Sequence, residues 1–298
     1  RRAGGAAAVD VARWVGAPGK GMETPLPPGD GWNVGKVEVA GEGPWTLAVG
    51  DAARELSRLA AGRPRLDCLA RVAKGAGTNA DRVFVMPADD DFGIEAPLLR
   101  QCLRGRDVRG YELRSSQVAL LPYDDARLIA PVELERFPRA QAYLANARPV
   151  LEARERGRFA GPTYYRWGRP QNLARLLDRA PKLVVPDAAA YGRAGLDREG
   201  LLVLDSAYAI RPLDGDEITL GLLLAVLNSA IVGTWLRATG IPLRGGYFRM
   251  KTAYLASLPV PDPKTSGARE VSRLALRMAA DDVTAQRELE ARVMMLYA

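Results

Sequence analysis

The sequence of 298 residues contains no histidine. This absence excludes Ser–His and Cys–His nucleophilic catalysis, histidine-ligated metals and acid–base catalysis by imidazole. The two cysteines, Cys68 and Cys102, are too few and too far apart for a zinc site without histidine. We expect both to be small buried residues of a protein in the reducing cytoplasm.

Long apolar runs are also scarce. The longest, residues 218–232, is interrupted by Asn228 and Ser229 and is too short to span a membrane. The first residues show no signal-peptide pattern. These features favour a cytoplasmic protein without membrane association.

The sequence also lacks the full residue set of a metal-dependent nuclease. A PD-(D/E)-x-K site begins at Pro186-Asp187, but Glu199 is followed by glycine and leucine, with no lysine. We interpret Asp187 as part of a turn that ends a strand. The acidic run Asp89–Asp91 is interpreted as a solvated turn, because it fixes no coordination geometry.

Positive charge is abundant and unevenly distributed. The chain has 42 Lys and Arg against 35 Asp and Glu, a net charge of +7. Residues 236–251 carry four basic residues and no acid, and residues 99–114 carry five arginines and two acids. A salt-bridged helix face would interleave the signs, so these clusters favour binding of an anionic polymer. A merely solvated basic surface is the alternative.

The pattern of elements predicts an α+β fold, because strands and helices are mixed along the chain without the regular βαβα order of an α/β fold. We expect a short helix within 6–15, an irregular linker to residue 44 and a helix over 51–61. A helix over 137–153 is interrupted at Pro149. A long buried helix covers 220–236, and amphipathic helices follow at 271–278 and 284–297. The predicted strands are 82–86, 117–121 paired with 127–130, 182–185 and 201–204.

Several blocks with distinctive residues occur along the chain. A glycine-rich turn lies in 71–85 and a basic turn in 97–111, and Tyr-Tyr-Arg-Trp-Gly-Arg-Pro occupies 164–170. Further blocks are Pro-Lys-Leu-Val-Val-Pro-Asp at 181–187, Leu-Ala-Val-Leu-Asn-Ser at 224–229 and Gly-Gly-Tyr-Phe-Arg at 245–249. In this order the blocks resemble the C-terminal specificity domain of TaqI-like adenine-N6 DNA methyltransferases and related fused restriction–modification enzymes. The resemblance covers residues 45–298.

The resemblance implies a DNA target-recognition domain over 45–264, preceded by a junction over 1–44 and followed by a helical segment over 265–298. The catalytic motif is missing, because the one Pro-Pro pair, Pro27-Pro28, lacks the flanking Asn or Asp and the aromatic residue. The chain is therefore expected to catalyse nothing alone. S-adenosylmethionine would belong to a methyltransferase domain acting in cis or in trans, and duplex DNA would be the partner. The alternative is a non-catalytic interaction domain whose long apolar helix docks a partner subunit.

The candidate DNA-binding residues are basic, polar or aromatic side chains within these blocks. Glycine would let backbone N–H groups approach a phosphate, and arginine would make a bidentate hydrogen bond to a phosphate or a guanine edge. Arg104 and Arg106 flank Gly105, so we expect neither to retreat into a core, with Asp107 as a brace. Tyr164 and Tyr165 are expected in a surface loop that contacts bases, with burial in the core as the alternative. The full set is Lys74, Thr78, Asn79, Arg104, Arg106, Arg109, Tyr164, Tyr165, Arg166, Arg169, Arg244, Tyr247, Arg249 and Lys251.

Overall fold

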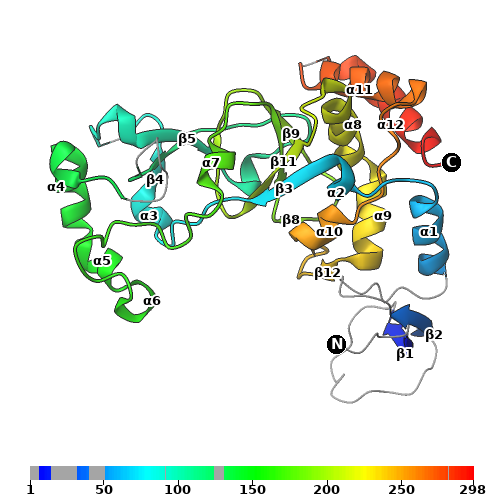
Figure 1. The fold of residues 1–298 in the computed structure, drawn as a ribbon, viewed down its shortest axis with the longest axis horizontal. Coiled ribbons are helices and arrows are strands. Elements are labelled where there is room, and N and C mark those ends of the chain that lie inside the picture. Colours follow the sequence, from blue (N-terminus) through cyan, green and yellow to red (C-terminus); the bar gives the residue numbers. More distant parts are fainter. Residues whose placement is uncertain (1–6, 15–31, 40–50, 91, 124–130, 281) are drawn as a thin grey trace.

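The computed structural model describes residues 7–14, 32–39, 51–90, 92–123, 131–280 and 282–298. Its architecture is α+β, as the sequence predicts. Figure 1 shows an elongated arrangement, with the helices of residues 217–239 and 266–295 at one end and those of residues 138–157 at the other. A four-stranded sheet, described below, lies between these two groups.

The N-terminal segment forms a two-stranded antiparallel sheet. Strand β1 (Ala7–Trp14) pairs with β2 (Trp32–Val39) from Ala7 opposite Val39 to Trp14 opposite Trp32. The predicted helix within 6–15 and the fully irregular linker are therefore wrong. Both strands are rich in valine and tryptophan, whose side chains favour extended backbone once a partner strand is available.

The central sheet separates two hydrophobic cores. Its strand order is β3 (Ala70–Lys74), β11 (Ala207–Pro212), β7 (Lys182–Pro186) and β9 (Gly195–Asp197), and all neighbouring pairs are antiparallel. Successive side chains of a strand point to opposite faces. Leu183 and Ile210 consequently enter the first core, whereas Val184 and Ala209 enter the second.

Helices build the first core. These are α1 (Asp51–Ala60), α2 (Leu66–Leu69), α8 (Glu217–Asn228), α9 (Ala230–Thr239), α10 (Thr252–Ala256), α11 (Ser266–Met278) and α12 (Gln286–Met295). Helix α8 is buried from Thr219 to Leu227, with α11 and α12 packed against it. The apolar helix that the interaction-domain alternative assigned to a partner is thus covered within this chain.

The predicted single helix over 220–236 is two helices, α8 and α9, joined at an angle of 66°. The Asn228 side chain donates to Leu224 O at 2.9 Å and to Ala194 O at 2.9 Å, and it accepts from Ala194 N at 3.0 Å. Ser229 Oγ donates to Val226 O at 2.7 Å. These side chains replace helical backbone partners, which ends α8 and confirms the packing role expected of this Asn-Ser pair. No single helix of the described residues is long and apolar enough to cross a bilayer; α8 and α9 reach that length only together, across their bend.

The second core lies under a mixed sheet ordered β10 (Leu202–Val203), β5 (Leu99–Leu103), β6 (Gln117–Leu120) and β4 (Val85–Pro87). Helices α3 (Asp81–Phe84), α4 (Pro138–Asn146), α5 (Arg148–Glu152), α6 (Arg154–Gly157) and α7 (Leu173–Leu176) accompany it. Pro149 lies in the first turn of α5, as the predicted interruption requires. The strand expected over 82–86 is mostly helix α3, and the expected partner strand 127–130 lies outside the described residues. Strand β6 pairs with β4 and β5.

A small fourth sheet lies at the rim of the first core. Strands β12 (Ile241–Pro242) and β13 (Phe248–Arg249) form an antiparallel hairpin, and β13 also pairs with β8 (Ala188–Ala189). Strand β8 follows β7 directly along the chain. The hairpin is therefore attached to the end of the central sheet.

Candidate nucleic-acid interface

The glycine-rich turn after β3 does not offer its backbone N–H groups to an anion. Gly75 N donates to Ala207 O at 3.0 Å and Ala76 N to Val203 O at 3.0 Å, while Gly77 N donates to Arg169 O at 2.9 Å. The expectation that this turn binds phosphate through its backbone is wrong, because the donors are already bonded within the fold.

Glycine is needed here for close packing. A Cβ on Gly75 would lie 2.0 Å from Leu204 O, and a Cβ on Gly105 would lie 2.4 Å from Ser206 O. Both predicted turns therefore press against the same segment, residues 203–207, between β10 and β11. Only glycine permits this approach of backbone to backbone.

Thr78 and Asn79 serve the turn itself. The Thr78 side chain is 1% exposed and its hydroxyl is bonded to Asp81. Asn79 has a positive φ of 57° and donates to Glu155 Oε1 at 2.6 Å. In this position Thr78 has almost no surface to offer DNA, so the structure does not support its place among the candidate DNA-binding residues. The exposed Asn79 side chain is already hydrogen-bonded to Glu155.

Arg154, which the sequence analysis did not select, joins this turn to the aromatic block. Its guanidinium donates to Thr78 O at 2.9 Å, Tyr164 O at 2.6 Å, Arg166 O at 2.9 Å and Leu151 O at 2.8 Å. The ring of Phe159 lies 4.2 Å away. Burial lowers the pKa of this arginine. The four carbonyl acceptors explain why a charged side chain is buried at this point.

The aromatic block does not form a base-stacking surface. Tyr164 and Tyr165 are 7% and 6% exposed, and Trp167 is 1% exposed. Tyr165 Oη donates to Val132 O at 2.6 Å, and Trp167 Nε1 donates to Leu120 O at 3.2 Å. The surface-loop prediction is wrong for these residues, because their rings fill the second core and have no free face for a base.

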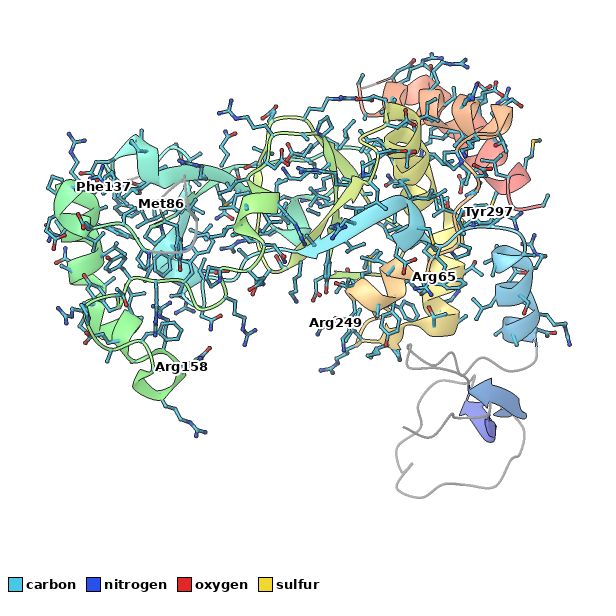
Figure 2. All side chains as sticks on the ribbon, in the orientation of Figure 1. Arg65, Met86, Phe137, Arg158, Arg249 and Tyr297 are labelled. Carbon is cyan, nitrogen blue, oxygen red and sulfur yellow. The ribbon has the colours of Figure 1, made fainter. Side chains whose placement is uncertain are left out.

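The arginines of the same block remain at the surface. Arg166 lies 5.2 Å from the Phe159 ring and donates to Arg158 O at 3.3 Å. Arg169 is exposed, and its backbone bridges to Gly77. Arg158 and Arg249 project from the lower side of the molecule in Figure 2, from different parts of the fold.

The arginines of the basic turn differ in their exposure to solvent. The Arg104 side chain is only 20% exposed and lies 3.2 Å from Asp81, contrary to the expectation that it stays out of the core. Arg106 is 63% exposed, donates to Gln117 Oε1 at 2.8 Å and has Asp107 at 3.8 Å. Asp107 accepts the Arg104 backbone N–H at 2.7 Å, so it braces the turn. Arg109 is exposed beyond it.

Four distant segments converge at Asp187. Its carboxylate accepts from Arg249 Nη1 at 2.7 Å and from Tyr208 Oη at 3.0 Å, and Lys74 Nζ lies 3.7 Å away. Burial, followed by the Asp187 charge and hydrogen bond, raises the pKa of Tyr208. Sequence reasoning selected Lys74 and Arg249 but assigned Asp187 to a turn, because its partners come from other strands.

Asp205 also belongs to this charged cluster. It lies in the 203–207 segment that both glycine-containing turns contact. Burial raises its pKa, as does the charge of Asp81, while Lys74 and Arg169 oppose the shift. The cluster therefore mixes cations with partly desolvated carboxylates. Such an arrangement holds basic side chains in fixed positions.

The β12–β13 hairpin and the residues just after it carry exposed members of the predicted set. Arg244 and Lys251 are exposed, and Tyr247 is 46% exposed. Gly245 and Gly246 both have positive φ, 80° and 79°, which closes the tight turn at the tip. Phe248 is partly buried against the first core and anchors the hairpin. An aromatic ring flanked by cations on an exposed turn suits contact with a nucleic-acid backbone or groove.

Other candidate chemistry is not supported by the described residues. They contain no cluster of three or more Cys, Asp or Glu side chains arranged for a metal. Cys102 is buried, which raises the pKa of its thiol to about 12. Cys68 is exposed, so the expectation that it is buried is wrong.

The comparisons with known proteins agree with the resemblance of the sequence blocks. Type II methyltransferase M.PaeR7I of Pseudomonas aeruginosa is 25% identical over 223 residues, which is 74% of this chain and 38% of that protein. M.XhoI of Xanthomonas vasicola is 26% identical over 257 residues, 83% of this chain and 45% of the relative. Adenine-specific methyltransferase PglX of Streptomyces coelicolor is 30% identical over 159 residues, 51% of this chain and 13% of its own length. The chain thus spans less than half the length of these relatives.

Among solved structures, the type IIG restriction endonuclease BpuSI matches 97% of this chain and 39% of its own, with a TM-score of 0.46 and 11% identity. The sequence profile of the TaqI-like C-terminal specificity domain matches residues 100–260, which include Asp187, Tyr208, Arg249 and the β12–β13 hairpin, but not Lys74. The chain belongs to the family of TaqI-like C-terminal specificity domains.

Proposed function

We propose that this chain is the DNA target-recognition part of an adenine-N6 methyltransferase or a fused restriction–modification enzyme. The observation that carries the proposal is the exposed β12–β13 hairpin within the family-matched range. The Arg244 and Tyr247 side chains of the hairpin, and the Lys251 side chain between β13 and α10, are exposed. Lysine and arginine that contact phosphates supply affinity and orientation, and contacts with base edges supply sequence discrimination.

The Asp187 cluster supports the hairpin in this role. Arg249 of β13 is bonded to Asp187 at the end of β7, so the hairpin is held against the central sheet. A preorganised cation loses less conformational freedom on binding than a mobile one. Methyl transfer, with S-adenosylmethionine as the donor, would take place in a separate methyltransferase domain, linked in cis or in trans. This chain would place the target adenine for flipping into that domain.

The test is binding of the full chain to duplex DNA, followed by fluorescence anisotropy at increasing chloride concentrations. We expect the logarithm of affinity to fall linearly with the logarithm of salt concentration. Arg244→Ala with Lys251→Ala should weaken binding by about 1–3 kcal/mol for each base-edge interaction removed. The same variant should lower the salt slope by about one for each phosphate that the protein no longer neutralises.

The control removes two exposed arginines of α11, Arg269 and Arg273, with the same change in net charge. Their removal should have a small effect, because long-range charge is screened at physiological salt. Affinity that does not depend on salt, or equal weakening in both double variants, would contradict a DNA-facing hairpin.

A further inference from the structure

A second concentration of cations lies on the face of the central sheet that carries Val184 and Ala209. A cavity of about 280 Å³ opens there, beside β3, β7 and β11. Its charged lining comes from three strands and from the end of α7, and none of these residues belongs to the predicted interface. The charged lining residues are Arg71, Arg175, Lys182 and Arg211.

The strand register places like charges side by side. Arg71 of β3 is directly opposite Arg211 of β11. The pairing of β11 with β7 includes Ile210 opposite Leu183, so Arg211 and Lys182 are the next residues along these two strands. Like charges at facing positions of a sheet are destabilising. A row of three cations therefore needs negative charge on this face.

Two carboxylates of the chain supply part of that charge. Lys182, 0% exposed, has Asp197 Oδ2 2.6 Å from its Nζ. Asp197 also accepts the backbone N–H groups of Glu199 at 2.8 Å, Gly200 at 3.1 Å and Leu201 at 2.9 Å. Most of the acceptor sites of this carboxylate are thus occupied by the turn that follows β9.

Asp178 is the second carboxylate. It is paired with Arg211 Nη1, and it also accepts the Ala180 backbone N–H at 2.9 Å. Arg211 Nη2 donates to the Asp178 and Ala180 carbonyls, each at 3.0 Å. Four cations therefore face two acids around the cavity, an excess of two positive charges.

Donors remain unsatisfied at the same place. Arg211 Nε is buried with no hydrogen-bond acceptor among the described residues, and Lys182 Nζ, despite its ionic contact with Asp197, makes no hydrogen bond of good geometry there. A buried donor without an acceptor costs on the order of 1–3 kcal/mol. Arg71 and Arg175 are exposed and complete the rim. A compact dianion would match the excess charge and would place acceptor oxygens at the exposed arginines above these buried donors.

We propose that this cavity binds a phosphate group, with Arg71, Arg175 and the partly exposed Arg211 in contact with it and the buried Lys182 beneath them contributing positive charge. The group is either a backbone phosphate of bound DNA or a free phosphate anion. The DNA source rests on the proposed function, whereas the free anion does not. The Pro-Lys-Leu-Val-Val-Pro-Asp block then has two functions: Lys182 at one end of β7 serves the phosphate site, and Asp187 at the other end organises the hairpin side.

The first experiment titrates inorganic phosphate into the full chain by calorimetry, with ionic strength held constant by chloride. The variant Arg71→Ala/Arg175→Ala removes the exposed rim and keeps the buried pairs, and Arg269→Ala/Arg273→Ala on α11 is the charge-matched control. We expect saturable binding by the wild type and the control, and affinity about tenfold or more lower for the rim variant. No saturable binding by the wild type, or equal weakening in both variants, would overturn the proposal.

The second experiment identifies the source with a duplex probe and fluorescence anisotropy in the presence and absence of phosphate. If the site takes a backbone phosphate, phosphate competes with DNA and the rim variant has a smaller salt slope than the control. If it takes a free anion, the rim variant and the control bind DNA equally and phosphate does not compete. Phosphate binding by a chain that binds no DNA would refute the proposed function alone, whereas DNA binding without phosphate binding would refute the phosphate site alone.

Discussion

Arg249 Nη1 donates to Asp187 Oδ2 at 2.7 Å, which ties the hairpin strand β13 to the end of β7. The other Asp187 oxygen accepts the Tyr208 hydroxyl and lies 3.7 Å from Lys74 Nζ. One carboxylate thereby orients a tyrosine and two cations that the sequence keeps far apart. It also removes part of the positive charge that these cations would otherwise present to DNA.

Replacing this carboxylate should therefore raise the affinity for duplex DNA of any sequence and lower the discrimination between sequences. In Asp187→Ala, Lys74 and Arg249 no longer share an acid, so binding to arbitrary duplex should strengthen and the salt slope should steepen by about one to two. Anisotropy with specific and unrelated duplexes gives both values. Glu290→Ala, at an exposed position of α12, is the control for the removal of one acid. A slope identical to the control would show that Asp187 does not restrain DNA-facing cations.

Substitutions of the two arginines in the basic turn should have different effects: one should change stability and the other should change DNA affinity. Arg104→Ala removes the mostly buried partner of Asp81, so it should lower the melting temperature and leave the DNA affinity of the folded fraction unchanged. Arg106→Ala, at a 63% exposed side chain, should leave folding unchanged and weaken DNA binding by about 1–3 kcal/mol if it makes a direct contact. Differential scanning fluorimetry and anisotropy on both variants measure the two effects. The opposite assignment of effects would contradict the structure.

Arg154 should be required for stability. Arg154→Ala removes a donor from four backbone carbonyls, of which Thr78 O keeps the Gly168 N–H at 3.1 Å, and the expected decrease is at least about 3 kcal/mol of unfolding free energy. Arg154→Lys should recover little, because an ammonium group lacks the planar fork that reaches several carbonyls. Urea unfolding provides the measurement. Arg158→Ala, at a 75% exposed side chain, should change stability by less than about 0.5 kcal/mol, and a similar effect of both substitutions would contradict the role of Arg154.

Asp205 should make stability depend on pH in the direction opposite to a salt-bridged carboxylate. Its folded-state pKa is raised by burial, so the folded state binds the proton more tightly than the unfolded state. Stability from this group is present below the unfolded pKa and is lost as pH rises through the folded pKa. Asp205→Asn should then stabilise the chain at neutral pH, with a gain that shrinks in acid. Urea unfolding at several pH values tests this, and a gain independent of pH would contradict the assignment.

Local pattern was enough to predict much of the secondary structure. Helix α1, the interruption at Pro149, strand β7 and helix α11 follow from periodicity and proline chemistry. The β1–β2 sheet was missed because an alanine-rich stretch carries a weak local signal and its partner strand lies 18 residues further on. The bend after α8 depends on Asn228 finding Ala194, a contact that no local window contains.

The interface was predicted less completely than the fold. The exposed hairpin and two partners of Asp187, Lys74 and Arg249, were selected from charge and glycine content, whereas Tyr208 was not selected. Thr78, Tyr164 and Tyr165 were chosen for their chemistry and are buried, because neither burial nor the carbonyls that surround Arg154 can be read from neighbouring residues. The row of Arg71, Arg211 and Lys182 appears only when three strands are in register. Pairing across a sheet, rather than residue type, decides these positions.

The packing of Gly75 and Gly105 against residues 203–207 bears on how new specificities can be engineered. Exchanging β5 and β6 with those of a relative would bring a foreign 97–111 turn against a resident 203–207 segment, where one added methyl group on Gly105 is not accommodated. The three segments therefore behave as a single inheritable unit, although more than a hundred residues separate the first from the last. Chimeras that transfer 71–85, 97–111 and 203–207 together preserve this packing, and crossovers placed between them break it.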